Sequence, residues 1–452
     1  GMLVELLGPL TVSGHHNLGR FGTVILSEGG RLIQFTNSSG PDIAGYTAHE
    51  EMNARRSIIL DDGLRTQNPA EIHYLGASAA ANYSIRSGDT LDGVIGVLRY
   101  SRGSGGSGDE TWRLMPTVDP QFTAANPRPS APAIGGAVRV ASFNVLNFFT
   151  TIDGGQSNCG PQSNQSCRGA DSNAEFARQL EKTVTALTML DADIIGLIEL
   201  ENNASESLRT LADAMNARTG TSDYTWVETG TIHNDVIKTG FIYRRSRVST
   251  IGNFAVLDRS VDSRFNDARN RPALAQSFVL DSSGAVLTIA VNHLKSKGSS
   301  CDADGDPNLG DGQGNCNITR TNAAAALADW LATDPTGSGD SDVLIIGDLN
   351  AYAEEDPLTA FARAGFTNLL GSQTNPYSFV FDAQSGALDH ALVSTSLAPQ
   401  VVDTMEWHIN ADEPRLLDYN LENGRDPNLF DGATPYRAPD HDPVVVGIDL
   451  TN

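Results

Sequence analysis

The sequence predicts an α/β layered domain over residues 137–452, preceded by a small all-β domain over residues 1–115. From Ala137 onward, strand patterns alternate with helical patterns, as is typical of α/β or α+β layered domains. Before residue 115, short strand patterns are separated by turn residues, and no long helical period is found. A chain of 452 residues is also long for one domain, so we expect two or three.

The first region contains five strand patterns rich in β-branched and apolar residues, and Glu28-Gly29-Gly30 is typical of a hairpin turn. The predicted strands are Leu3–Leu7, Gly22–Ser27, Arg31–Asn37, Ser57–Asp61 and Val94–Tyr100. We expect a small antiparallel barrel of the oligonucleotide-binding (OB) type, although a sandwich is also compatible with these strands. The region has nine arginines, no lysine and twelve acidic residues. It therefore shows no basic stripe, and its binding of single-stranded nucleic acid stays a hypothesis.

A stretch rich in proline and poor in apolar periodicity follows, from Pro116 to Gly136. Such a composition predicts a linker between the two domains.

The second region supplies most of the regular pattern. A helix is predicted over Glu175–Leu190 from its apolar spacing. Strands are predicted over Val138–Phe143, Asp193–Ile198, Lys238–Tyr243, Ala273–Leu280, Val286–Asn292, Val343–Ile346, Ala387–Ser394 and Asp442–Asp449. Polar residues stand at or near many of these strand ends, namely Asn144, Glu199, His293, Asp348, Asn350, Asp389 and Asp440. So many polar strand ends in one domain indicate a shared site.

The net charge of -24 predicts repulsion from nucleic acid, because binding to phosphates depends on Lys and Arg. The local charge differs, since two of the four lysines, Lys295 and Lys297, lie beside His293. High salt or divalent cations would also weaken the long-range repulsion. No apolar run approaches the roughly 18 residues of a membrane span, so we expect none.

Four cysteines form two local pairs, Cys159 with Cys167 and Cys301 with Cys316, each in a stretch rich in Gly, Asn, Asp and Ser. Two loop disulfides are the natural interpretation, and a zinc site of four thiolates is the alternative. Disulfides predict a secreted or periplasmic protein. Gly1-Met2 looks like a pair of residues added at the start of the chain. A signal peptide or a further domain could have been cut away before it.

Six short motifs carry the polar strand ends. In chain order they are Ser142-Phe143-Asn144, Ile198-Glu199, Asn292-His293, Gly347-Asp348-Leu349-Asn350, Leu388-Asp389-His390 and Asp440-His441-Asp442-Pro443. Together they resemble the endonuclease/exonuclease/phosphatase (DNase I-like) superfamily. The strand-rich N-terminal region, Cys159 with Cys167, and Asn292–Lys297 with the Asp-rich loop after it resemble a narrower group, the ExeM/NucH-type bacterial extracellular nucleases. The resemblance implies a four-layer α/β sandwich, with two mixed sheets face to face and helices outside.

The resemblance also implies a metal site. A phosphodiester resists hydrolysis because of its own charge and its alkoxide leaving group, so its hydrolysis needs a hard cation, a positioned water and a proton donor. Glu199 is expected to be the main Mg²⁺ or Mn²⁺ ligand, with Asn144 and Asp440 completing an oxygen-rich shell. Glu201 stays open as the alternative to Glu199.

The remaining motif residues receive roles from the same resemblance. Asp348 is expected to orient and deprotonate the attacking water or to bind a second metal, and Asn350 to hold a phosphate oxygen, since the two point the same way on a strand. His441 is expected to contact the scissile phosphate as an imidazolium whose pKa is raised by Asp389. His293 would be a donor to the leaving oxygen, with Asp235 as its nearest candidate partner.

Basic residues near these motifs are candidates for binding the substrate. Arg271 resembles the family's phosphate-contacting arginine, with a surface salt bridge as the alternative, and Lys295 and Lys297 favour a polyanionic polymer. His390, His233 and His408 are expected to be structural or peripheral.

The loop after Lys297 has carboxylates at alternate positions, Asp302, Asp304 and Asp306, followed by Asp311. This spacing suits Ca²⁺, although the glutamate of an EF-hand is absent. A solvated acidic loop closed by Cys301 and Cys316 is the alternative.

The expected function is a secreted, Mg²⁺- or Mn²⁺-dependent DNA endonuclease without sequence specificity that leaves 5′-phosphate ends and acts as a monomer without a membrane. DNA and RNA substrates, and one or two metals, stay open. The alternatives are another phosphoesterase on the same fold, such as a sphingomyelinase or a phosphatase, and a catalytically idle DNA-binding protein.

Overall fold

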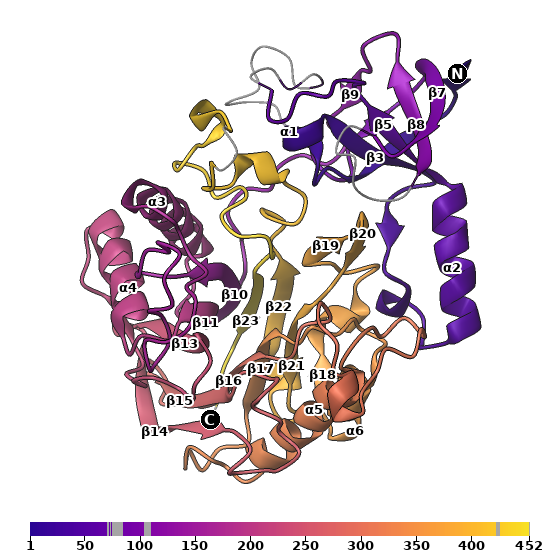
Figure 1. The fold of residues 1–452 in the computed structure, drawn as a ribbon. Coiled ribbons are helices and arrows are strands. Elements are labelled where there is room, and N and C mark those ends of the chain that lie inside the picture. Colours follow the sequence, from indigo (N-terminus) through magenta and orange to yellow (C-terminus); the bar gives the residue numbers. More distant parts are fainter. Residues whose placement is uncertain (70–71, 73, 75–84, 104–109, 422–424, 452) are drawn as a thin grey trace.

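The computed structural model describes residues 1–69, 72, 74, 85–103, 110–421 and 425–451 (Figure 1). Two six-stranded sheets, called the paired sheets below, form its larger part. The first has the order β12 (Tyr224–Trp226), β13 (Ile237–Arg244), β11 (Ile194–Glu201), β10 (Val138–Phe148), β23 (Val444–Ile448) and β22 (Val401–Glu406). The second has the order β14 (Val248–Leu257), β15 (Ala273–Leu280), β16 (Val286–His293), β17 (Val343–Asp348), β21 (Asp389–Val393) and β18 (Thr367–Asn368).

The paired sheets face each other across an apolar core that takes residues from both, such as Val140, Ile198, Ile289 and Ile346. Helices α3 (Asn173–Leu190) and α4 (Glu206–Thr219) cover the outer face of the first sheet, and α5 (Asn317–Leu331) and α6 (Asp356–Arg363) cover that of the second. Because the central strands are covered on both faces, they read as continuous apolar runs. The order helix, sheet, sheet, helix agrees with the four layers expected from the sequence.

The N-terminal residues form an eight-stranded sheet, called the N-terminal sheet below. Its order is β1 (Met2–Leu6), β7 (Val94–Ser101), β8 (Thr111–Pro116), β5 (Ser57–Asp61), β3 (Thr23–Glu28), β2 (Leu10–Gly14), β6 (Thr90–Leu91) and β9 (Phe122–Thr123). Strands β1 and β2 follow each other directly in the chain and stand at the two ends of the run β1-β7-β8-β5-β3-β2. The run of strands therefore curves, so that its last strand, β2, comes back toward its first strand, β1.

Two expectations for this region were wrong. The predicted strand Arg31–Asn37 is a strand only over β4 (Leu32–Ile33), and a 3₁₀ turn, η1 (Phe35–Asn37), follows it. An unexpected α-helix, α2 (Ile43–Arg55), begins where the Asp42 side chain accepts a hydrogen bond from the Gly45 N–H. Its period escaped detection because only Asn53 of this helix is buried, so it has no apolar stripe. A four-residue helix, α1 (Leu18–Phe21), lies between β2 and β3.

The N-terminal sheet and the paired sheets are joined by a small third sheet. Strands β19 (Phe379–Phe381) and β20 (Gln384–Gly386) form a hairpin, and β20 pairs in parallel with β4. The segment 116–136 was predicted as a linker. Its first residue, Pro116, is the last residue of β8, and the segment also contains β9. It packs on the first paired sheet, where the Ser130 carbonyl accepts a hydrogen bond from Trp407. The other 3₁₀ turns are η3 (Asp302–Asp304), η4 (Leu369–Ser372), η5 (Ala398–Gln400), η6 (Arg415–Leu417) and η8 (Pro427–Leu429).

Both expected disulfides are present, Cys159–Cys167 and Cys301–Cys316. The described cysteines are therefore all paired, and the zinc alternative is wrong. Among the described residues, no helix has the length and apolar character needed to cross a membrane.

Candidate active site

The polar strand ends meet at one edge of the paired sheets because of how their strands are paired. Strands β16 and β17 are parallel, which puts His293 opposite Asp348. Strand β21 runs antiparallel on the other side of β17 and puts Asp389 opposite Asp348. In the facing sheet, parallel β10 and β11 put Asn144 opposite Ile198, the neighbour of Glu199.

Gly347 allows the close approach of two of these strands. Its φ of +131° is rarely adopted by residues with a side chain, and a Cβ here would lie 2.1 Å from the Asn292 carbonyl oxygen. Gly347, which has no side chain, therefore stands between the apolar run Val343–Ile346 and Asp348.

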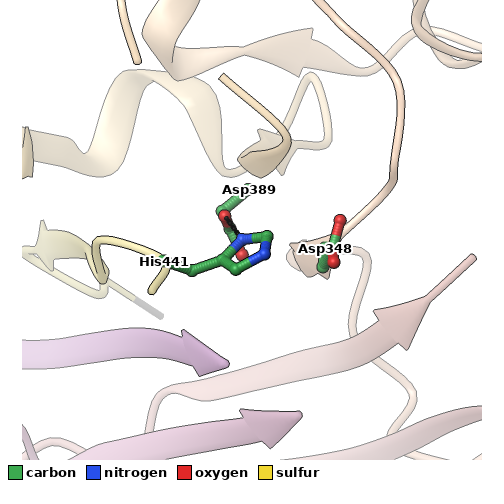
Figure 2. A group of neighbouring side chains, drawn as sticks. All are labelled: Asp348, Asp389 and His441. Carbon is green, nitrogen blue, oxygen red and sulfur yellow. Dashed lines mark hydrogen bonds and ion pairs between the residues drawn. The ribbon is translucent and has the colours of Figure 1, made fainter. Parts of the chain in front are cut away.

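His441 and Asp389 form a buried pair. The Nδ1 atom of His441 lies 2.7 Å from Asp389 Oδ2, and Figure 2 shows the other ring nitrogen directed toward Asp348. Burial alone would lower the pKa of His441, but the charges of Asp389, Asp348 and Asp440 and the hydrogen bond raise it well above its usual value. His441 is thus an imidazolium at neutral pH. Its ring stacks on Phe379 at a centroid distance of 4.5 Å.

Asp348 is buried and turns one oxygen back to its own turn, since Oδ1 accepts a hydrogen bond of 2.9 Å from the Asn350 N–H. Burial raises the pKa of Asp348 to about 7, an effect that His441 opposes and the charges of Asp389 and Glu199 increase. Asn350 has a left-handed φ of +49° and donates a side-chain hydrogen bond to the Leu294 carbonyl. One amide hydrogen of Asn350 is therefore used in holding the turn.

Glu199 stands in an irregular part of its strand. The pairings of β11 with both neighbours shift there, and Glu199 itself has a φ of +66°. Bulges and left-handed residues re-aim a side chain at the cost of about 1 kcal/mol or more. The Glu199 carboxylate accepts hydrogen bonds from Asn144 Nδ2 at 3.3 Å and from the Asn147 N–H at 3.0 Å.

His293 lies between the two carboxylates, with Nε2 3.6 Å from Asp348 and 3.9 Å from Glu199. Burial, and then the charges of Arg271, His441, Arg168 and Lys295, lower its pKa well below the usual value. His293 is therefore a neutral imidazole. Its Nδ1 atom is buried without a hydrogen-bond partner among the described residues.

Two buried oxygens beside Glu199 lack hydrogen-bond partners in the described part of the chain, Asp440 Oδ1 and Asn147 Oδ1. Burial and then the charge of Asp440 raise the pKa of Glu199. Unpartnered buried oxygens next to a carboxylate fit a hard divalent cation, which prefers oxygen ligands. Asp348, Asp389 and His441 also place one possible ligand atom each within 4.8 Å of one another, a group that could hold a metal only with His441 in its neutral form.

Comparison with known proteins gives the family. The sequence matches the Endonuclease/Exonuclease/phosphatase family over residues 141–410, more than half of the 452-residue chain. The chain belongs to this family. Its members are nucleases and phosphatases, which hydrolyse phosphate esters.

Solved structures also match this family member, at low sequence identity. The catalytic domain of human Nocturnin has 16% identity and a TM-score of 0.41, over 70% of this chain and 93% of its own. An endonuclease/exonuclease/phosphatase from Bacteroides vulgatus has 14% identity and a TM-score of 0.42, over 70% and 99%. TDP2 of D. rerio, in complex with a single-strand DNA product, has 14% identity and a TM-score of 0.39, over 68% and 97%. No curated protein matches the sequence.

Four predictions about individual acidic and basic residues need correction in this family member. Asp235 is not the partner of His293, because its carboxylate lies 3.2 Å from Arg271 Nε. Arg271 stays at the site, where its backbone N–H donates to the His293 carbonyl. Glu201 does not replace Glu199 as the ligand, because both of its oxygens face other groups. Its Oε2 accepts hydrogen bonds from Asn203 and from the N–H groups of Thr150 and Thr151, and its Oε1 lies 3.4 Å from Cys159 Sγ.

Lys297 does not face a substrate. It forms an ion pair with Glu355, donates to the Gln313 carbonyl at 2.9 Å and packs over the Tyr352 ring. Lys295 remains near the site, since it contributes to the lowered pKa of His293, and its own pKa is lowered to about 8 by burial and then by the charge of Arg271.

The calcium loop is the fourth correction. Asp306 accepts hydrogen bonds from the N–H groups of Ile318 and Thr319 at the start of α5, and Asp304 pairs with Arg269 at 2.6 Å. Asp302 is exposed. Since the three carboxylates face different partners, the loop caps a helix and does not converge on an ion.

Sequence reasoning missed three residues that shape the site. Ser378 donates a hydrogen bond of 2.7 Å to Asp389 Oδ2, while its oxygen accepts from the N–H groups of Leu388 and Asp389. The backbone N–H of Asn147 donates to Glu199, and the Phe379 ring stacks on His441. Asn147 follows Asn144 by three residues, so the motif Ser142-Phe143-Asn144 could have pointed to it. Nothing in the sequence around Ser378 and Phe379 indicates a role in the site. His390, as expected, is structural, since its Nε2 bonds the Ala351 carbonyl.

Proposed function

We propose that this chain is a secreted, Mg²⁺- or Mn²⁺-dependent endonuclease that hydrolyses DNA without sequence preference and leaves 5′-phosphate ends. The observation that carries the proposal is the buried His441–Asp389 pair facing Asp348, beside the unpartnered oxygen of Asp440 and the carboxylate of Glu199. Such a site combines a fixed positive charge on His441, an acceptor for the proton of water in Asp348, and an oxygen-rich site for a divalent metal ion beside Glu199 and Asp440. A phosphodiester needs all three.

The side chains divide the work according to their protonation. His441 stays an imidazolium because of Asp389, and it stabilises the charge that develops on the scissile phosphate. Asp348, with a pKa of about 7, ionises near neutral pH and accepts the proton of the attacking water. Asn350 holds a phosphate oxygen through its remaining amide hydrogen, and neutral His293 donates a hydrogen bond to the leaving oxygen.

Glu199, Asn144 and Asp440 would hold the divalent cation, and Asn147 offers a further oxygen. When bound, the cation supplies charge neutralisation at the phosphate and lowers the pKa of a bound water. Arg271 and Lys295 contribute positive charge beside His293, where a phosphate would lie.

The rest of the chain supports an extracellular nuclease of the ExeM/NucH type. The two disulfides fit an oxidising compartment. The strand run that returns on itself, with parallel β5 and β8, supports an OB-type barrel over residues 1–115, followed by a linker over residues 116–136 and a catalytic domain over residues 137–452. We propose that the protein acts as a monomer and needs no membrane.

The test is hydrolysis by the full chain of four substrates: supercoiled plasmid DNA, RNA, sphingomyelin and a phosphate monoester, each with Mg²⁺, Mn²⁺ or EDTA. We expect nicking of the plasmid that requires the metal, with nicks that a ligase reseals because they carry 5′-phosphates. Hydrolysis of sphingomyelin or the monoester without nicking would instead assign another phosphoesterase, and no hydrolysis in any metal would contradict an enzyme altogether.

Variants connect the activity to the site. His441→Ala and Asp348→Ala should each lower kcat by several orders of magnitude, because each removes a charge that acts on the reacting atoms. His49→Ala is the matched control, since His49 bonds the Ile33 carbonyl in the N-terminal region. A residual rate within about tenfold of wild type, with an unchanged circular dichroism spectrum, would remove His441 or Asp348 from its role.

A further inference from the structure

A cleft of about 900 Å³ lies between the N-terminal sheet and the paired sheets. One wall is formed by the segment from Gly14 to Ile25, which contains α1, and the other by the β19–β20 hairpin and part of the segment 411–440. Figure 1 shows that this C-terminal segment, drawn in yellow, lies to the lower left of the N-terminal sheet. Leu146, Asn147 and Asp440 also line the cleft, so it reaches the side chains next to Glu199.

The charge of the cleft is opposite to that of the molecule. Six arginines line it, against four acidic residues, whereas the whole chain has 31 basic and 55 acidic residues. The arginines are Arg20, Arg102, Arg113, Arg168, Arg415 and Arg437. A cluster of this sign in so acidic a protein indicates an anionic ligand.

Two of the acidic residues in the cleft already have arginine partners outside it. Glu413 pairs with Arg86 at 2.7 Å and with Arg128 at 2.8 Å, and Asp418 pairs with Arg425 at 2.6 Å. By contrast, Arg168 is exposed, forms no hydrogen bond or salt bridge within the described residues, and its charge acts on His293. The buried Nε of Arg437 likewise lacks a hydrogen-bond partner there. Arg113 is paired with Asp61 at 3.0 Å, and Arg415 lies 3.7 Å from Asp418. Within the described residues Arg20, Arg102 and Arg168 have no carboxylate partner, so part of the positive charge in the cleft is available for a ligand.

Aromatic side chains stand among the arginines. Phe21, Phe379, Phe381 and Tyr419 line the cleft, and Phe381, at the end of β19, is 58% exposed. Phe379 connects the cleft to the proposed chemistry, because its ring stacks on His441. Alternation of cations with aromatic faces is the pattern of sites for single-stranded nucleic acid, in which bases stack and phosphates meet the charges.

We propose that this cleft binds one strand of DNA, a few nucleotides long, and directs it to the site of Asp348 and His441. The proposal rests on the proposed nuclease function and names how that site receives its substrate. The volume of about 900 Å³ is within the roughly 300–1,000 Å³ of ligand pockets and leaves room for a few nucleotides of one strand. The pairing of β20 with β4 and the salt bridge of Arg31 to Asp412 connect the two walls, so the cleft exists without a ligand.

The first experiment measures binding of a fluorescein-labelled single-stranded oligonucleotide by anisotropy, with the full chain carrying Asp348→Asn so that the probe is not cut. We expect the added double substitution Arg20→Glu with Arg415→Glu to raise Kd at least tenfold. It should also flatten the dependence of log Kd on log salt by at least about 1.4, because each lost contact to a single strand removes about 0.7. The control pair, Arg218→Glu with Arg363→Glu, makes the same charge change on exposed positions of α4 and α6 and should leave Kd within twofold.

The second experiment tests stacking separately from charge. Phe381→Ala should raise Kd by about 5-fold to 150-fold, the loss expected for one stacked base, with the salt dependence unchanged. A blunt duplex of the same length should respond to neither set of substitutions by more than about twofold, since a duplex does not enter the cleft. Equal losses for duplex and single strand would overturn the assignment to one strand.

The cleft proposal and the nuclease proposal can be contradicted independently of each other. If wild-type protein nicks plasmid but the arginine and Phe381 variants bind the single strand as tightly as the control pair, the cleft proposal is wrong and the nuclease stands. If the single strand binds with the predicted losses but wild type cuts no DNA in any metal, the cleft binds DNA and the nuclease proposal is wrong.

Discussion

Ser378 shows how much of the site depends on single side chains without a sequence signature. The motif Asp440-His441-Asp442-Pro443 and the Asp389 motif predicted the His441–Asp389 pair, and the structure places the two 2.7 Å apart. Ser378 belongs to no motif. Its hydroxyl donates a hydrogen bond to Asp389 across a turn of the chain, a contact that a pattern along one strand does not show. Asp235 was misassigned for a similar reason: the sequence offered it as a candidate partner of His293, but could not show that its carboxylate pairs with Arg271.

Ser378→Ala should lower kcat by about 10-fold to 100-fold without unfolding the protein. The lost hydrogen bond to a charged group contributes about 1.5–3 kcal/mol, and each 1.36 kcal/mol corresponds to a factor of ten in rate. Ser378 acts through Asp389 on His441, so the high-pH limb of the activity profile, where His441 loses its proton, should shift while KM changes little. Ser372→Ala, an exposed serine in the same connection, is the control. An unchanged kcat together with an unshifted high-pH limb would show that Ser378 does not position the pair.

The ionisation of Asp348 should connect activity with stability. Its folded-state pKa of about 7 lies above the ordinary 3.8, chiefly because of burial. Folding therefore favours the protonated form, and the stabilisation is full below about pH 4 and is lost as the pH rises through about 7. The activity, which needs the carboxylate, should rise over the upper part of this window. Asp348→Asn should remove the activity and gain Tm relative to wild type between pH 4 and pH 7.

The comparison uses metal-free protein in EDTA and differential scanning calorimetry at several pH values. Asp213→Asn, an exposed position on α4, controls for the loss of one negative charge and should give a difference in Tm that does not change with pH. A Tm difference for Asp348→Asn that is equally flat would contradict the raised pKa.

Several strands and one helix were predictable from apolar patterns in the sequence. Ser57–Asp61 and Ala273–Leu280 have the bounds that the sequence predicted, and α3 begins two residues before its predicted start. The sequence failed for α2 because a helix that buries almost nothing has no period to detect. It failed for Asp302, Asp304 and Asp306 because spacing in a loop does not show which backbone N–H groups the carboxylates face.

The two disulfides should stabilise the fold by different amounts. Cys301→Ser with Cys316→Ser opens a loop of 15 residues and should cost about 3 kcal/mol of unfolding free energy, through the entropy of the unfolded chain. Cys159→Ser with Cys167→Ser opens a loop of 8 residues and should cost about 0.6 kcal/mol less, since the entropy of loop closure grows slowly with length. Urea unfolding of both variants, with wild type under oxidising and reducing conditions, measures the costs. A larger cost for the shorter loop would show that lost native contacts dominate over chain entropy.

The joining of the N-terminal sheet to the paired sheets was beyond the sequence. The partners in this contact are separated by hundreds of residues: Arg31 meets Asp412, and Arg128 meets Glu413. Charge patterns along the chain cannot specify such pairs, whereas six ordered motifs could specify the layered fold around the site. The cleft, whose walls belong to both ends of the chain, could be found only in three dimensions.

Asp412 is the residue on which this contact should depend. It is fully buried, with Arg31 at 2.6 Å, Tyr377 Oη at 2.9 Å and Asn126 Nδ2 at 2.7 Å. Asp412→Ala should cost about 3–5 kcal/mol, because it leaves the partly buried Arg31 cation without its carboxylate partner. Since the affinity of the cleft for a single strand needs both walls, Asp412→Ala should also weaken that binding, whereas Asp213→Ala should change neither.

The same contact should make the protein sensitive to acid. Arg31 and Arg86 hold the folded-state pKa of Asp412 far below the ordinary 3.8, against the opposing effect of burial. The unfolded state therefore binds the proton more tightly, so the stabilisation by Asp412 is complete above about pH 4 and declines as the pH falls below it. In urea titrations, wild type should lose stability below pH 4 more steeply than Asp412→Asn, which has no carboxylate to protonate. Parallel curves for the two proteins between pH 2 and pH 6 would show that the buried salt bridge does not control how the N-terminal sheet is held to the paired sheets.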